Sequence, residues 1–102
     1  HIVTGHIDGV SVIEDIWPDG DPKRYKFSIP NDLEFLLAKK GSVAVNGVSL
    51  TINAVNSSAF EVNIIPHTME KTTFRSLVAG DRVNIEDDIL ARYVDRQLKN
   101  MR

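Results

Sequence analysis

The segment KKGSVAVNGVSLTIN, residues 39–53, decides the fold of this chain. Asn46 and Gly47 stand between two runs in which apolar and small polar residues alternate. This dipeptide predicts a two-residue β-hairpin turn, because both residues tolerate positive φ. The pairs expected across the hairpin are Ser42 with Thr51, Val43 with Leu50, Ala44 with Ser49, and Val45 with Val48.

The predicted register gives the hairpin two different faces, because successive side chains of a strand point to opposite sides. One face is apolar and belongs in a core: Val43, Val45, Val48, Leu50 and Ile52. The other face is small and polar: Ser42, Ala44, Ser49, Thr51 and Asn53. The simpler interpretation makes the polar face the solvated side of an antiparallel sheet. The alternative is a hydroxyl-rich shelf that holds a flat polar ligand.

The rest of the chain predicts further short strands and little helix. Strands are expected within residues 2–16, where Gly5 and Gly9 interrupt β-branched residues, and over 24–29, 60–65 and 82–86. Helical segments are expected over 30–40, as one turn within 67–73, and over 87–101. A closed sheet removes exposed strand edges. We therefore predict an all-β fold: a six-stranded antiparallel Greek-key barrel with a short helix and a C-terminal helix.

Composition excludes several classes of protein. The 102 residues suffice for one domain, and a net charge of −2 does not favour binding to nucleic acid. The absence of cysteine excludes disulfides and thiolate metal sites. The three histidines lack metal-ligand spacing, and no apolar run approaches membrane-spanning length. The first residue is His1 and not Met, so we expect the chain to begin partway through a longer protein.

No familiar catalytic motif is present, so the residues alone leave only weak candidates. Ser49 and Thr51 lie on the polar face of the hairpin, and His6 shares a strand face with Asp8 if that strand is regular. A histidine on a strand is more often structural or exposed than catalytic. Lys40 is most simply a charge at a helix C-terminus, and Asp88 most simply a helix cap.

Five segments taken together resemble riboflavin synthase in their order and spacing. They are GHIDG (5–9), KGSVAVNGVSLT (40–51), IPHT (65–68) with TT (72–73), GDRVNIE (80–86) and ARYV (91–94). Members of that family have two similar six-stranded barrels, followed by a helix that assembles a trimer. This chain resembles the second half. The resemblance implies a lumazine-binding barrel over residues 1–88 and an oligomerisation helix over 89–102.

The resemblance also implies a reaction. The family is a cytoplasmic transferase that converts two molecules of 6,7-dimethyl-8-ribityllumazine into riboflavin and 5-amino-6-ribitylamino-pyrimidinedione, without a metal or an organic cofactor. Its ligand lies against the outer wall of one barrel and is covered by the other half of a neighbouring subunit. The expected partners are therefore the lumazine, riboflavin, the N-terminal barrel of the same family and, at full length, two further subunits. Nucleic acid and membranes are not expected partners.

Matching motif positions imply roles for individual residues. Ser49 and Thr51 would hydrogen-bond the ring or the ribityl chain, and His6 would assist proton transfer, which makes these three the catalytic candidates. The remaining substrate-binding candidates are Ile65, Thr68 and the backbone near Ile7, which would surround the ring, with Lys40 and Asp88 at the rim. Two alternatives stay open: a non-catalytic lumazine or flavin carrier of the same fold, and a barrel without a ligand. The second-half motifs favour the enzyme.

Overall fold

A computed structural model describes residues 7–30 and 41–87 of the chain. Within these ranges the strands are β1 Gly9–Pro18, β2 Lys23–Ser28, β3 Ser42–Val45, β4 Val48–Thr51, β5 Ala54–Val55, β6 Ala59–Ile64 and β7 Arg82–Asp87. A short helix, α1 (Pro66–Lys71), and a 3₁₀ turn, η2 (Thr73–Ser76), separate β6 from β7. The helix expected over 30–40, the C-terminal helix and the domain boundary after residue 88 lie outside the described residues.

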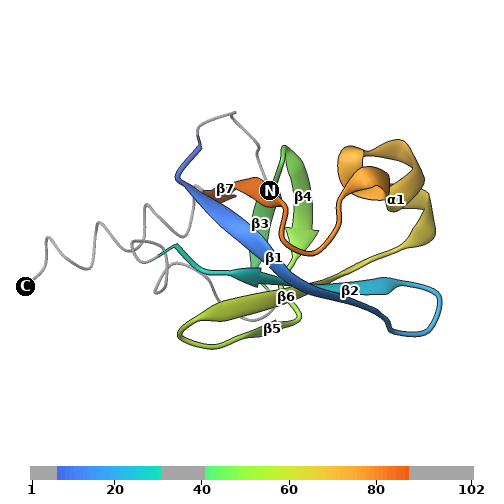
Figure 1. Cartoon of the computed structure of the whole chain (residues 1–102), viewed down its shortest axis with the longest axis horizontal. Helices are drawn as coiled ribbons and strands as arrows, with labels where there is room; N and C mark the ends of the chain where they lie inside the picture. Colours follow the sequence, from blue (N-terminus) through green and yellow to red (C-terminus); the bar gives the residue numbers. More distant parts are fainter. Residues whose placement is uncertain (1–6, 31–40, 88–102) are drawn as a thin grey trace, which may run out of the picture.

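The strands form one antiparallel sheet in the order β4-β3-β7-β1-β2-β6-β5, curled into a half-barrel (Figure 1). The all-β, antiparallel prediction is confirmed. The strand count differs, because the described residues contain seven strands where six were expected. The extra strand arises because the chain leaves the hairpin after Thr51. The next two-residue strand, β5, then pairs with β6 at the other end of the sheet.

The predicted hairpin is confirmed at every position. Ser42 pairs with Thr51, Val43 with Leu50, Ala44 with Ser49 and Val45 with Val48. The turn residues Asn46 and Gly47 have φ values of 49° and 81°. Both values lie in the left-handed region that this turn requires, which explains why Asn-Gly occupies it.

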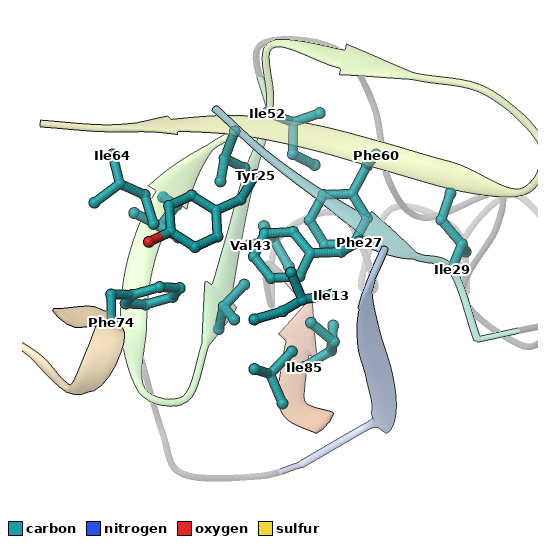
Figure 2. Packing of buried hydrophobic residues seen from close by; sticks show 14 residues of the cluster. Ile13, Tyr25, Phe27, Ile29, Val43, Ile52, Phe60, Ile64, Phe74 and Ile85 are labelled. Carbon is teal, nitrogen blue, oxygen red and sulfur yellow. The ribbon is translucent and has the colours of Figure 1, made fainter. Parts of the chain in front are cut away.

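The core fills the concave side of the curled sheet. Alternation predicts ten inward residues, namely the five on the apolar face of the hairpin and Phe60, Val62, Ile64, Val83 and Ile85 on later strands. Nine of the ten are buried: Val43, Val45, Leu50, Ile52, Phe60, Val62, Ile64, Val83 and Ile85. The tenth, Val48, is partly buried and packs against them. Figure 2 shows the aromatic residues at the centre, where the rings of Phe27 and Phe60 stack at 5.1 Å and Phe74 meets Tyr25 edge-on at 5.5 Å. The η2 turn thus places Phe74, which the sequence did not single out, in the core.

Strand β1 extends further at its C-terminal end than the sequence predicts. The strand was expected to lie within residues 2–16, but Trp17 pairs with Arg24 and Pro18 pairs with Lys23. The turn is confined to residues 19–22 and contains a hydrogen bond from the Asp19 N–H to the Pro22 carbonyl, 2.9 Å. A register shift between Ile13 and Asp15 lets β1 pair with β7 over its first half and with β2 over its second. This bend helps to curl the sheet.

Candidate functional site

The two hydroxyls of strand β4 lie on the outer wall of the half-barrel. Ser49 and Thr51 are exposed, and Leu50 between them is buried, as the alternation of a strand requires. Neither hydroxyl forms a hydrogen bond with another described residue. Both are therefore available to an external ligand, and the predicted outward placement of this pair is confirmed.

At the β6–α1 corner the chain passes from the end of β6, a spatial neighbour of β4, into the helix. Ile65 precedes α1 and is 52% exposed, and Thr68 on the helix is partly buried. Strands β4 and β6 are spatial neighbours, and Asn53, two residues after Thr51, hydrogen-bonds to β6. The structure thus brings the two hydroxyls and the corner onto adjacent elements. The exposed isoleucine and the exposed hydroxyls, on these adjacent elements, offer apolar and polar contacts to a ring system.

Helix α1 is fixed to the core through Thr72. The Thr72 hydroxyl donates to the Thr68 carbonyl at 2.8 Å and accepts from the Phe74 N–H at 3.3 Å. Since Phe74 is only 1% exposed, the end of the helix is joined to a buried side chain. This link holds Thr68 in place although the helix itself buries no residue.

A cavity of about 550 Å³ opens on the part of the outer wall formed by β3 and β7. Its lining comprises Ile7, Ala44, Asn46, Gly47, Thr73, Arg82, Asn84, Ile85 and Glu86. Among the sequence-predicted site residues, Ile7 lines this cavity and is 54% exposed. The sequence reasoning missed Arg82 and Asn84, which are exposed between the inward side chains of β7. Their alternation with Val83 was visible in the sequence, but the pairing of β7 with β3 was not.

One residue of the predicted polar shelf is buried. Ala44 was expected on the same face as Ser49, and the register is correct, but Ala44 is 1% exposed. Strand β3 lies between β4 and β7, so Ala44 has a paired residue on each side: Ser49 on β4 and Glu86, itself buried, on β7. A methyl group between two larger side chains contributes no polar surface. The exposed hydroxyls are therefore those of β4.

Three predicted site residues, His6, Lys40 and Asp88, lie outside the described residues. Asp8, the expected neighbour of His6, donates its N–H to the Ile85 carbonyl at 2.8 Å, which ties the entry of β1 to β7. Over residues 7–30 and 41–87, no group of three or more histidines and carboxylates is placed to hold a metal ion. No helix in those ranges is both long and apolar enough to cross a membrane.

The chain matches a known protein family. Residues 4–88 match the lumazine binding domain. The chain belongs to this family. This lumazine binding domain is 44% identical over 98 residues to riboflavin synthase of Photobacterium phosphoreum, covering 96% of this chain and 45% of that protein. It is 47% identical over 96 residues to riboflavin synthase of Brucella abortus (strain 2308), covering 94% and 48%.

Solved structures give the same assignment. The lumazine binding domain superposes on LumP complexed with riboflavin with a TM-score of 0.79 at 28% identity, over 86% of this chain and 47% of that one. For LumP complexed with 6,7-dimethyl-8-(1'-D-ribityl) lumazine the TM-score is 0.77, also at 28% identity, over 86% and 49%. The resemblance to riboflavin synthase is confirmed. The chain spans about half the length of the curated relatives that it matches.

Proposed function

We propose that this lumazine binding domain binds 6,7-dimethyl-8-ribityllumazine and riboflavin on its outer wall and serves as one half of a riboflavin synthase. The proposal rests on the exposed hydroxyls of Ser49 and Thr51 on β4 and on the exposed side chain of Ile65, which directly follows the neighbouring strand β6. The hydroxyls bind polar atoms of the ring or the ribityl chain, and Ile65 contacts the ring face. Similarity to riboflavin synthases, and to LumP in complex with both compounds, supports this ligand class.

The chemistry of the substrate explains why such a modest site is enough. Two lumazine molecules give riboflavin and 5-amino-6-ribitylamino-pyrimidinedione, and the reaction begins when a ring methyl group loses a proton. The ring delocalises the resulting anion, so the protein has mainly to hold two rings together and to place donors where charge collects. His6 transfers protons near neutral pH. Thr68 and the backbone at Ile7 surround the ring, and Lys40 and Asp88 bind at its rim.

A complete site in this proposal needs a second barrel. One outer wall binds one lumazine, and the N-terminal barrel of a neighbouring subunit supplies the second molecule and covers the first. The full-length enzyme is accordingly a cytoplasmic trimer assembled through the C-terminal helix. The isolated chain is then expected to bind ligand weakly and to turn over little.

Binding is tested directly by titrating the 102-residue chain with the lumazine while the fluorescence of the ligand is measured. Saturable binding of the lumazine and of riboflavin, with no binding of free ribitol, is the expected result. Absorbance of riboflavin in the same samples tests catalysis. Turnover comparable with that of a two-barrel riboflavin synthase would contradict the shared-site proposal, and the absence of any binding would contradict the ligand assignment.

The second candidate function is a non-catalytic lumazine or flavin carrier, for which the observation is that the similar protein LumP has been solved in complex with the lumazine, riboflavin and flavin mononucleotide. Mixing the chain with a separately produced N-terminal barrel of a riboflavin synthase distinguishes the two functions. Riboflavin formation above that of either part alone supports the enzyme half, and binding without formation supports the carrier. In the active mixture, His6→Gln should lower the rate about a hundredfold if His6 transfers a proton. An unchanged rate would assign His6 no catalytic role.

A further inference from the structure

We infer that Asn53 is a positioning residue of the proposed lumazine site, because it fixes strand β4 against the β6–α1 corner. The inference rests on the proposed function and adds to it a residue that touches no ligand. Ser49 and Thr51 lie on β4, and Ile65 follows the last residue of β6. Their relative placement decides whether one ring can contact both.

The geometry of the link is specific. Asn53 follows β4 by two residues, and its backbone N–H donates to the Glu61 carbonyl on β6 at 2.8 Å. Its side-chain Oδ1 accepts from the Asn63 N–H, also at 2.8 Å. The preceding residue, Ile52, is 1% exposed and donates its N–H to the Gly41 carbonyl at 2.8 Å. The end of β4 is therefore joined both to the start of β3 and to β6.

This link matters because β4 and β6 form no ladder with each other within the described residues, and Asn53 is where the chain leaving β4 meets β6, directly before the β5–β6 pairing begins at Ala54. Strand β4 stands at one end of the strand order and β6 stands next to the other end. Among the described residues, β4 forms a ladder with β3 alone. Apolar packing of Leu50, Ile52 and Ile64 brings the two strands together. Apolar packing is not directional, however, so the two hydrogen bonds of Asn53 determine how the end of β4 is aligned along β6.

The β6 side of the link is held by further polar contacts. The Asn63 side-chain oxygen accepts from Arg24 Nε at 2.8 Å, and its amide nitrogen donates to Asp19 Oδ2 at 3.1 Å. Arg24 also binds Glu61 Oε1 at 3.0 Å. Two other elements thus hold the β6 residues to which Asn53 is bonded: the β1–β2 turn through Asp19, and β2 through Arg24. Loss of the Asn53 side chain is therefore expected to release β4 rather than β6.

Two substitutions of Asn53 and one control separate positioning from general stability. Asn53→Ala removes the acceptor, and Asn53→Asp retains an oxygen at the same place. The control is Asn56→Ala, because Asn56 Oδ1 likewise accepts backbone N–H groups, those of Ser58 and Ala59, but in the β5–β6 turn. Each variant is titrated with 6,7-dimethyl-8-ribityllumazine, unfolded with urea, and assayed for hydrogen exchange at the Asn63 N–H.

Asn53→Ala should speed exchange at Asn63 and weaken lumazine binding about fivefold or more. Asn53→Asp should restore affinity to within about twofold of the unchanged chain, and Asn56→Ala should leave affinity within the same range while lowering the urea midpoint. If Asn53→Ala does not fold, Asn53→Ser replaces it with the same expectation, since its shorter side chain ends well before Asn63.

Three results would overturn the inference. In the first, Asn53→Ala speeds exchange at Asn63 but leaves affinity unchanged. In the second, Asn56→Ala weakens binding as much as Asn53→Ala, which would show that general stability is responsible. Both leave the proposed function intact. In the third, the unchanged chain does not bind the lumazine, and the proposed function fails together with this inference.

Discussion

Asn46 and Asn84 join the hairpin turn to strand β7 by two reciprocal hydrogen bonds. The Asn46 N–H donates to the Asn84 carbonyl at 2.9 Å, and the Asn84 N–H donates to Asn46 Oδ1 at 2.7 Å. The β3–β7 ladder ends at Val45, so the Asn46 side chain supplies the acceptor that the turning backbone no longer offers. One asparagine therefore adopts the left-handed turn conformation and also extends the sheet.

The double role of Asn46 predicts a graded series of stabilities. Asn46→Ala loses one hydrogen bond and strains the turn, so it should lower the free energy of unfolding by about 2–3 kcal/mol. Asn46→Gly avoids the strain but still loses the hydrogen bond, so it should lower the free energy of unfolding by about 1 kcal/mol. Asn46→Asp retains an acceptor and should lower it by less than about 1 kcal/mol. Urea unfolding measures all three. Equal losses for the alanine and aspartate variants would contradict the assigned side-chain bond.

Removal of the Ser49 hydroxyl is predicted to weaken lumazine binding without changing the stability of the fold. Ser49→Ala leaves no cavity and breaks no hydrogen bond to residues 7–30 or 41–87, so the free energy of unfolding should change by less than about 0.5 kcal/mol. Lumazine binding should weaken by about 0.5–1.5 kcal/mol through the loss of one hydrogen bond. Fluorescence titration measures this, and Ser57→Ala, at an exposed serine in the β5–β6 turn, is the matched control. Equal affinities for both variants would remove Ser49 from the site.

Removal of the Thr72 hydroxyl is predicted to loosen helix α1 locally. Thr72→Val keeps the shape of the side chain but removes both the donor to Thr68 and the acceptor for Phe74, so it should cost about 1–2 kcal/mol of stability. Thr72→Ser keeps both bonds and should cost less than half as much. Hydrogen exchange within residues 66–71 should accelerate in the valine variant before exchange in the strands does. Uniform acceleration across all strands would contradict a local role.

Burial of Tyr25 predicts a loss of stability in alkali. Desolvation raises the pKa of Tyr25 above its ordinary value of 10.0. The folded state therefore keeps this proton at a pH where the unfolded state has released it. The contribution is fully present below pH 10, and it is lost as the pH rises through the folded pKa.

Replacement by phenylalanine isolates this contribution. Unfolding curves from pH 8 to pH 11 should show the free energy of unfolding falling more steeply in the unchanged chain than in Tyr25→Phe. All other titratable groups are the same in both proteins, so their contributions cancel from the comparison. Parallel curves above pH 10 would show that the Tyr25 hydroxyl is as well solvated in the folded state as in the unfolded one.

Local chemistry made the central hairpin predictable from the sequence. The Asn-Gly turn fixes the loop length, and the loop length fixes the register, so the pairing of Val43 with Leu50 followed directly. Alternation then placed Ser49 and Thr51 outward and Leu50 inward. The same local rules identified Phe60, Val62 and Ile64 as inward residues of β6.

Contacts between distant segments were not predictable in the same way. Phe74 lies in a polar stretch, and its burial depends on the η2 turn that Thr72 caps. Ala44 has the expected parity, but its burial depends on Glu86, from a strand about forty residues further along the chain. Turn chemistry does not specify which strands become neighbours.

By itself, the sequence determined the elements whose geometry is encoded within a few residues: the hairpin, its register, the inward faces of the strands, and the motifs shared with riboflavin synthase. Only the tertiary structure decided that the strand expected over residues 48–53 ends at Thr51 and that Asn53 crosses to β6. The physical reason is that a turn specifies pairing between adjacent segments, whereas curling of the sheet depends on side chains from several strands filling one core. Strand β4, which carries Ser49, and strand β6, which leads to Ile65, thus became neighbours through core packing and two hydrogen bonds of Asn53.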